Sequence, residues 1–307
     1  MQRQRLILDR RQLTLNYEAG CLIIRHPDDS PRTLPIERIR QVICMHGVQL
    51  SSHVLGQFRH RQIDFVVLNL RHADHSVALY GDGARQQQRR LVQYQWQCDP
   101  ESALPLAVSL CRHRLQRAIR CLLPYEHPTA LDCARSLPLA RAAMLEATTL
   151  EQLRGLEGQA QAQVFDAWRQ LLPSGLGFVR RQRQPPPDPV NGLLSLTYSL
   201  VYQEAVRACL MAGLDGQLGC YHRLLAGRES LACDVMEPLR PDIESWVVQL
   251  FLQGIVTKRQ FTRPKAGQAC LLGKEARVIF YQALAKVQPS WWRQLQATTR
   301  WLCRRMA

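Results

Sequence analysis

The side chains that could carry chemistry are densest between Gly213 and Pro241. One imidazole, His222, is followed by two carboxylates, Asp234 and Glu237, and glycines before it let the backbone turn closely. Imidazole nitrogen and carboxylate oxygen are donors that hold a divalent cation, and such an ion can act on a phosphate group. The pattern therefore predicts a metal site with activity on phosphate.

The two acids have a second interpretation. Asp234 and Glu237 are three residues apart, like the partners in a capping box, where two side chains satisfy the first amides of a helix. Pro238 would fit the first turn of that helix, where an amide has no partner anyway. The spacing alone leaves both a metal site and a helix cap open.

A further acid lies far upstream, between two glycines. Glu157 follows Gly155 and precedes Gly158 in a stretch whose periodicity predicts a helix over 150–172. Each glycine inside a helix costs about 1 kcal/mol relative to alanine, which indicates that another group approaches this backbone closely. A buried Glu157 would need a partner, and an ion pair with a neighbouring arginine is the alternative to a functional role.

The charge of the chain indicates a polyanionic partner. Lysine and arginine number 40 against 25 aspartates and glutamates, which gives a net charge of +15, and arginine greatly outnumbers lysine. Because arginine forks onto phosphate, we expect the partner to be nucleic acid. Residues 173–189 carry Arg180, Arg181 and Arg183 in a proline-rich loop, which is either a basic surface near the site or a plain linker.

A basic stripe is also predicted on the helix over 103–123. His113, Arg117 and Arg120 lie opposite its apolar face, and Arg112 and Arg114 flank them. This side of the helix is either solvated or in contact with DNA.

Other totals narrow the class of protein. No apolar run is long enough to span a bilayer, and the first residues, MQRQRLILDRRQ, lack the apolar core of a signal peptide. We therefore expect a cytoplasmic protein without a membrane partner. The 11 cysteines are odd in number and include no C-x-x-C pair, which is typical of reduced thiols and argues against a zinc site.

The elements around these residues predict an α+β fold. Residues 1–83 contain short strands and turns, which indicate a β-rich scaffold and dimerisation domain. Residues 84–102 form a basic connector, and residues 103–307 have the helical period of a larger all-α catalytic domain.

The helical domain is predicted to have a central helix, with further helices on either side of it in sequence. The helix over 192–212 is apolar nearly all round, so we expect it to be central, with Asn191 as its N-cap. Thr149 is the expected N-cap of the helix over 150–172, and a hairpin-like pattern covers 260–272. Further helices are predicted over 137–147, 243–256, 274–286 and 290–306.

Four motifs occur in order along the chain. They are Leu153–Gly158 (LRGLEG), Pro185–Tyr198 (PPPDPVNGLLSLTY), Gly219–His222 (GCYH) and Asp234–Pro241 (DVMEPLRP). In this order the chain resembles CRISPR-associated protein one, the metal-dependent integrase of spacer acquisition in CRISPR antiviral defense. The resemblance covers nearly the whole chain, from the β-rich domain through the connector to the helical domain.

The resemblance implies a set of site residues. The family's metal ligands fall at Glu157, His222 and Glu237, with Asp234 as a nearby supporting carboxylate. The implied ion is Mg²⁺ or Mn²⁺. Tyr198 matches a tyrosine near the family's site and is a further candidate catalytic residue.

Two more positions belong to this comparison. Arg240 follows the last ligand and joins the three loop arginines named above as a candidate for neutralising the DNA backbone without reading bases. Cys220 and Tyr221 stand where the family usually has large apolar residues, a departure that concerns local packing.

The resemblance also implies a reaction and an assembly. The 3′-hydroxyl of a captured DNA fragment, the prespacer, attacks the CRISPR repeat in a transesterification, and with water as nucleophile the same site is an endonuclease. The implied assembly is a homodimer joined through the β domains and bridged by CRISPR-associated protein two. Two other classes stay open, a metal-dependent nuclease that never joins strands and a non-catalytic DNA-binding subunit.

Overall fold

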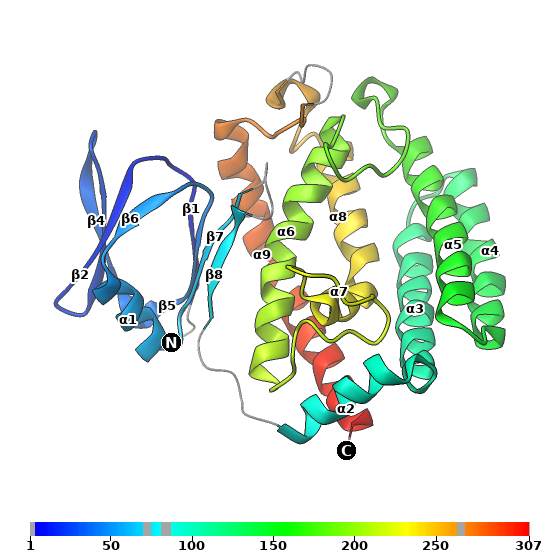
Figure 1. The fold of residues 1–307 in the computed structure, drawn as a ribbon. Coiled ribbons are helices and arrows are strands. Elements are labelled where there is room, and N and C mark those ends of the chain that lie inside the picture. Colours follow the sequence, from blue (N-terminus) through cyan, green and yellow to red (C-terminus); the bar gives the residue numbers. More distant parts are fainter. Residues whose placement is uncertain (1–3, 70–74, 81–86, 263–267, 307) are drawn as a thin grey trace. The chain divides into compact units, whose positions relative to one another are not determined.

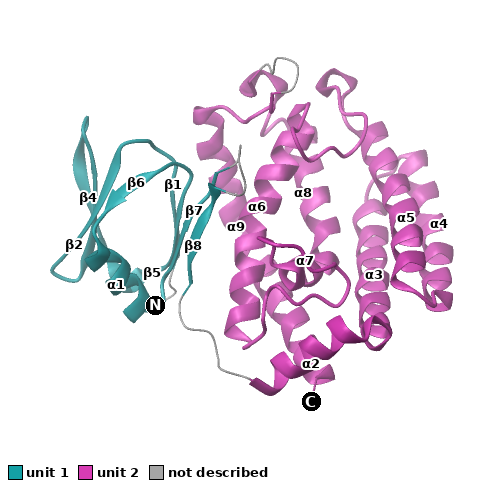
Figure 2. Cartoon of the chain, viewed as in Figure 1, with its two compact units in different colours: residues 1–84 teal, residues 85–307 magenta. Residues whose placement is uncertain are grey.

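Two compact units make up the chain, residues 1–84 and residues 85–307 (Figure 2). They are seen in a computed structural model that describes residues 4–69, 75–80, 87–262 and 268–306. Strands dominate the first unit and helices the second (Figure 1). This order confirms the predicted α+β fold, while the predicted boundary at residue 83 lies outside the described residues.

Strands of the first unit form two sheets. One has the order β1 (Gln4–Leu8), β5 (Ile39–Cys44), β7 (Asp64–Val67) and β8 (Val77–Leu79), with β7 and β8 antiparallel and the other pairs parallel. The other has the order β4 (Asp29–Pro35), β3 (Cys21–His26), β2 (Leu13–Glu18) and β6 (Val48–Leu50), with a parallel β2–β6 pair. Between these strands lie η1 (Ile36–Arg38) and α1 (Ser52–His60).

An apolar core joins both sheets to α1. On β2, the buried Leu13 and Leu15 alternate with less buried residues, as a strand with one covered face requires. Leu15, Val42 of β5 and Phe58 of α1 are fully buried in the same apolar cluster. This burial gives the first unit a core of its own.

Long helices build the second unit, and short helices connect them. The long helices are α2 (Gln87–Cys98), α3 (Pro100–Leu122), α4 (Pro128–Ala143), α5 (Leu150–Leu171), α6 (Pro189–Met211), α8 (Arg240–Leu252) and α9 (Lys274–Arg305). The short elements are η3 (Met144–Glu146), η4 (Ser174–Leu176), α7 (Ser230–Met236), η5 (Glu237–Leu239) and η6 (Lys258–Gln260). Across the described part of the chain, no helix is both long and apolar enough to cross a lipid bilayer.

Two helices organise this unit. The predicted central helix is α6, which is buried along most of its length and packs against α7, α8 and α9 (Figure 1). Helix α3 packs against α4, α5, α8 and η5. Because α5 and η5 are distant in sequence, their shared contact with α3 is what brings their side chains together.

Several predicted boundaries differ from the structure; helix α8, for example, spans Arg240–Leu252 rather than 243–256. Helix α6 begins at Pro189, and its N-cap is Asp188, whose side chain accepts the Asn191 amide at 2.9 Å, so Asn191 is not the cap. Helix α4 begins at Pro128, earlier than predicted. Helix α9 is continuous through Pro289, where two helices were expected. The expected N-cap at Thr149 is confirmed, since its hydroxyl accepts the Gln152 amide.

Helix α2 lies within the stretch interpreted as a connector and is part of the second unit. The Gln93 side chain is buried, and its Nε2 donates to the carbonyls of Asp215 and Leu218 at 2.8 and 2.9 Å. The Gln97 amide likewise donates to the Gly219 carbonyl at 2.7 Å. Helix α2 therefore fixes the backbone of the loop that leads to His222.

Candidate functional site

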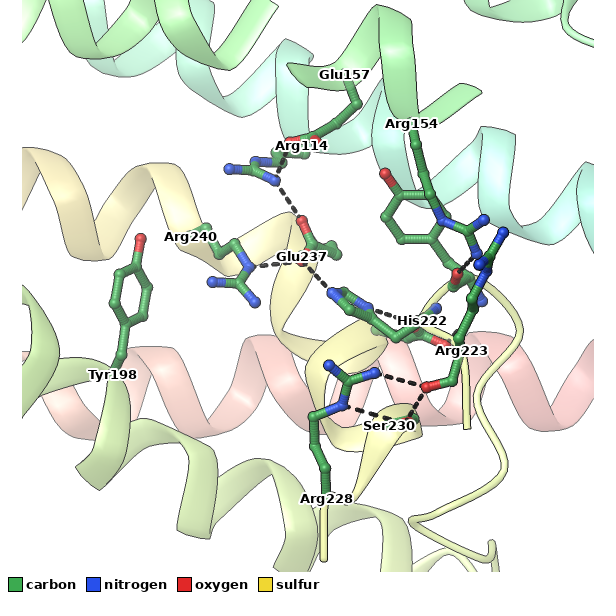
Figure 3. Close-up of polar contacts among 12 residues, drawn as sticks. Arg114, Arg154, Glu157, Tyr198, His222, Arg223, Arg228, Ser230, Glu237 and Arg240 are labelled. Atoms are coloured by element: carbon green, nitrogen blue, oxygen red, sulfur yellow. Dashed lines mark hydrogen bonds and ion pairs between the residues drawn. The ribbon is translucent and has the colours of Figure 1, made fainter. Parts of the chain in front are cut away.

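Glu157, His222 and Glu237 face one pocket although they come from distant segments. Glu157 lies on α5, His222 in the loop between α6 and α7, and Glu237 at the start of η5. All three line a pocket of about 890 Å³, and Figure 3 shows their side chains with the polar contacts around them. The packing of α3 against both α5 and η5 creates this arrangement.

Short distances connect the three side chains. The Nε2 atom of His222 lies 3.7 Å from Oε1 of Glu237. The Nη1 atom of Arg114 donates to Oε1 of Glu157 and, at 2.6 Å, to Oε2 of Glu237, so one nitrogen contacts both carboxylates. The three candidate ligands converge in space, and their role as ligands stays a prediction.

Arg114 lies between the two acids rather than beside an exposed basic stripe, so its predicted position is wrong. It is 7% exposed, because α5 and η5 cover this side of α3. The ion-pair alternative for Glu157 is therefore present in the structure. Within the described residues, no three His, Cys, Asp or Glu side chains already form a group that could hold a metal ion.

Asp234 holds the histidine in place. Its Oδ2 atom accepts the amides of Cys220 and Tyr221 at 2.6 and 3.0 Å. Its Oδ1 atom accepts the His222 amide at 2.9 Å and lies 2.6 Å from Nδ1 of the ring. Because Asp234 engages Nδ1, the opposite nitrogen is the one that lies near Glu237, as in imidazole ligands oriented by a carboxylate.

The capping-box interpretation of Asp234 and Glu237 is wrong. Asp234 lies inside α7 and its oxygens bind the 220–222 loop rather than the first amides of a helix. Glu237 binds Arg114 and accepts Nε of Arg240 at 2.6 Å. Gly219 is required by this arrangement, since a Cβ there would lie 2.8 Å from Oδ2 of Asp234 and 2.8 Å from the His222 carbonyl.

The glycines beside Glu157 need a different explanation from close packing. A Cβ added at Gly155 or Gly158 would meet nothing within 4 Å, so no other part of the described chain approaches this backbone. Gly158 nevertheless lines the pocket and Gly155 does not. The interpretation of a close approach is therefore wrong within the chain, and at Gly158 the open space belongs to the pocket.

Glu244 is a member of the site that the sequence reading missed. It is 1% exposed on α8 and accepts the Tyr198 hydroxyl at 2.7 Å and the Gln161 side-chain amide at 3.1 Å. Its Oε1 atom also lies 3.8 Å from Nη2 of Arg114. Its signal was the seven-residue spacing from Glu237, which places two acids on the same side of a helical stretch, about two turns apart.

The two buried glutamates differ in their proton affinity. Burial favours the neutral form of Glu237, but the charges of Arg240, Arg114 and His222 outweigh it and lower the pKa to about 2. For Glu244, burial raises the pKa, and the charge of Arg114 with the hydrogen bonds from Tyr198 and Gln161 opposes it only in part. Glu237 is therefore an anion at neutral pH.

Carboxylates outnumber basic side chains in the ion-pair cluster of the pocket. Its ion pairs connect four carboxylates, Glu157, Asp234, Glu237 and Glu244, with the guanidinium groups of Arg114 and Arg240 and the imidazole of His222. The carboxylates outnumber these three basic side chains, even when the imidazole is counted among them. Burying a carboxylate without an opposite charge is unfavourable, and a divalent cation would supply such a charge to this cluster.

Three of the four predicted DNA-contacting arginines lie at the pocket without a carboxylate partner among the described residues. Arg180 and Arg183 are exposed, and Arg181 donates to Oδ1 of Asn191 at 2.9 Å and lies over the Tyr198 ring at 5.6 Å. Arg240 differs, because it is buried against Glu237 and lies 5.2 Å from the Tyr198 ring centre.

Other arginines of the pocket were not predicted. Arg154 donates to the Tyr221 carbonyl at 2.7 Å, and Arg228 donates to the Arg223 carbonyl at 2.6 Å (Figure 3). Arg223 and Arg154 both pair with Glu151. Tyr221 is itself buried, as Cys220 is, so the loop before the histidine fills its apolar positions with these two residues.

Known proteins are similar to this chain in sequence and in fold. The sequence model of one family, described as CRISPR associated protein Cas1, matches residues 6–286. A CRISPR-associated endonuclease Cas1 of Thermodesulfovibrio yellowstonii is 29% identical over 283 residues, which cover 90% of this chain and 88% of that protein.

Solved structures agree in fold. A Cas1 protein from Thermotoga maritima superposes with a TM-score of 0.87 at 18% identity, over 99% of this chain and 97% of that one. A casposase bound to an integration product has a TM-score of 0.81 at 16% identity, over 99% and 91% of the two chains. A chain of a Cas6-RT-Cas1–Cas2 complex has a TM-score of 0.82 at 22% identity, over 99% of this chain and 35% of that one.

Proposed function

The chain belongs to the Cas1 family, and from this premise we propose that it is a divalent-metal-dependent DNA integrase of CRISPR adaptation with associated endonuclease activity. The observation that carries the proposal is the convergence of Glu157, His222 and Glu237 in one arginine-lined pocket. The likeness to a casposase bound to an integration product supports strand transfer as the reaction class.

The residues present fit Mg²⁺ or Mn²⁺. Two carboxylates and an imidazole nitrogen are donors that these ions accept, and carboxylates outnumber basic side chains in the cluster that they would enter. Glu157, His222 and Glu237 would hold the ion, with Asp234 orienting the imidazole. When bound, the ion supplies a Lewis acid for the scissile phosphate and the leaving oxygen.

The reaction we propose exchanges one phosphodiester for another. The 3′-hydroxyl oxygen of a prespacer gives up its proton and bonds to a phosphorus of the CRISPR repeat. The bond from that phosphorus to the neighbouring 3′-oxygen breaks, and the leaving 3′-oxygen takes up a proton. Arg180, Arg183 and Arg228 would bind the DNA phosphates along the pocket. Tyr198 would act by position, since it donates to Glu244 and supports the guanidinium groups of Arg181 and Arg240.

The proposed partners follow from the same comparisons. DNA, as prespacer and repeat, is the substrate, and Cas2 is the protein partner, as in the Cas6-RT-Cas1–Cas2 complex. We also propose a homodimer joined through the strand-rich unit. Size-exclusion chromatography with light scattering on the full chain, with and without Cas2, measures both associations.

Two other functions are separated by one assay. A nuclease that never joins strands would cut branched DNA but leave supercoiled repeat DNA without joined prespacer. A non-catalytic DNA-binding subunit would do neither, and its main structural basis, the helix cap, is absent. Half-site integration of a labelled prespacer with Cas2 and Mg²⁺ tests the proposal, and cleavage without joining would replace it by the nuclease.

Replacing Asp234 with asparagine should weaken the site without removing a ligand. We expect about a 10- to 100-fold loss of integration at fixed metal concentration, because the neutral side chain orients the imidazole less well. The loss should shrink as Mn²⁺ is raised. Asp132→Asn, on the exposed side of α4, is the matched control. An unchanged metal dependence in a folded Asp234→Asn protein would contradict the assigned role.

Replacing Gly158 with alanine should separate stability from activity. The free energy of unfolding should rise by about 0.5–1 kcal/mol, since the new methyl group meets open space and glycine disfavours a helix. Integration should fall by about 10- to 100-fold because the methyl group enters the DNA pocket and displaces the substrate.

Gly155→Ala is the matched control on the same helix, since it has the same open surroundings outside the pocket. It should stabilise the protein equally and leave integration unchanged. Denaturant unfolding and the half-site assay measure both effects. Equal activity of the two variants would mean that DNA does not approach this part of α5.

A further inference from the structure

The guanidinium of Arg114 lies between Glu157 and Glu237. It would have to leave this position if the two carboxylates shared a metal ion. One of its nitrogens, Nη1, contacts both carboxylates, so the guanidinium occupies the space between them. A divalent ion held by the same two carboxylates needs that space, and two cations so close together repel strongly in a buried site.

The contacts of Arg114 are also incomplete. Its Nε atom is buried and has no hydrogen-bond partner among the described residues. Its Nη2 atom lies 3.8 Å from Oε1 of Glu244, close enough to attract but too far for a hydrogen bond. Buried arginines normally have hydrogen-bond partners for their N–H groups. The guanidinium of Arg114 could therefore form more hydrogen bonds in another position.

Glu244 offers that other position. Its carboxylate is buried on α8 and already oriented by Tyr198 and Gln161, so it needs no rearrangement to accept a cation. Arg240 is not an equivalent candidate for movement, because its Nε is bonded to Glu237 while its guanidinium lies over the Tyr198 ring.

We propose that Arg114 is a resident cation of the metal-free site, and that metal binding moves its guanidinium from Glu157 and Glu237 onto Glu244. The proposal rests on the metal site proposed above and adds a role to two of this chain's own residues. Arg114 keeps the ligand carboxylates together and neutralised while the ion is absent. Glu244 lowers the free energy needed to move Arg114 away from these two carboxylates, because it accepts the guanidinium in its new position.

The test is a double-mutant cycle read out by metal binding to the full chain. Arg114→Met, Glu244→Gln and the double variant are titrated with MnCl₂ by calorimetry. Arg114→Met should bind Mn²⁺ about 10-fold more tightly than the unmodified chain, because no cation has to leave. Glu244→Gln should bind about 10-fold more weakly, because Arg114 loses its second position.

The decisive number is the effect of Glu244→Gln in the Arg114→Met background. In that background we expect Glu244→Gln to change the Mn²⁺ affinity by less than about twofold, since there is no arginine for Glu244 to bind. If Glu244 attracted the ion directly, its loss would weaken Mn²⁺ binding equally in both backgrounds, and the proposal would be overturned. Unchanged Mn²⁺ affinity in both single variants would overturn it as well, with the metal site intact.

A thermal measurement gives an independent readout. In EDTA, Arg114→Met should melt at a lower temperature, because Glu157 and Glu237 lose their shared cation, and Mn²⁺ should raise its melting temperature more than that of the unmodified chain. If Arg114→Met does not fold, Arg114→Gln, whose amide can still donate to a carboxylate, should show the same order of Mn²⁺ affinities.

A matched control exists at the same helix interface. Arg117 and Asp242 form an ion pair between α3 and α8 and do not line the pocket. Arg117→Met and Asp242→Asn remove the same charges from the same helices, and neither should change Mn²⁺ affinity by more than about twofold. Absence of Mn²⁺ binding to the unmodified chain would overturn the inference and the proposed metal site together.

Discussion

Replacing Glu237 with glutamine is expected to reduce both strand transfer and DNA cleavage by about 10³-fold while DNA affinity stays within about twofold. Glu237 is buried and anionic, with Arg114, Arg240 and His222 around it. The amide keeps the shape and an acceptor for Arg240 but offers a poorer ligand. The chemistry would lose the proposed Lewis acid, while the pocket arginines proposed to bind phosphate remain.

The measurements are filter binding of a labelled prespacer, half-site integration with Cas2, and cleavage of branched DNA. Glu126→Gln removes the same charge from an exposed glutamate outside the pocket and should leave all three unchanged. Circular dichroism confirms that each variant is folded. Near-normal integration by a folded Glu237→Gln protein would mean that the cluster is only a structural ion-pair network.

The fold was predictable where the pattern of apolar residues within a single helix or strand indicates which of its faces are buried. The apolar surface around α6 is such a local signal, and it predicted the observed burial. Pro289 led to the wrong prediction of two helices. The helix continues through it, and beyond the proline Trp291 packs edge-on against Trp246, with 5.3 Å between the ring centres. A tertiary contact therefore compensated for the hydrogen bond that proline removes.

The convergence of the three candidate ligands was predictable from the sequence, and the residues that contact them were not. His222, Asp234 and Glu237 share one short segment, and the resemblance supplied Glu157. Arg114 and Glu244 could not be assigned in the same way, because their contacts join α3, α5, η5 and α8, which are separated along the chain. An arginine at the edge of a helix face is buried or exposed depending on which helices cover it, and sequence spacing does not determine that.

The affinity of the chain for duplex DNA should fall by about 10³-fold between 50 and 200 mM salt. Besides the two arginines of the ion-pair cluster, six arginines line the pocket: Arg154, Arg180, Arg181, Arg183, Arg223 and Arg228. If each neutralises one phosphate, the slope of log affinity against log salt is about −5. The binding should depend little on sequence, since backbone contacts carry no base information.

The slope itself tests which arginines touch DNA. Arg180→Gln and Arg183→Gln should each make it shallower by about 1, because both side chains are exposed at the pocket and pair with no carboxylate of the residues that the structure describes. Arg135→Gln is the control, since it removes the same charge from α4, where Arg135 already pairs with Asp132. A slope that Arg135→Gln changes as much as Arg180→Gln would mean that DNA responds to the total charge of +15 rather than to this pocket. A flat salt response would remove the electrostatic basis for DNA binding altogether, because phosphate contacts cannot form without releasing counterions.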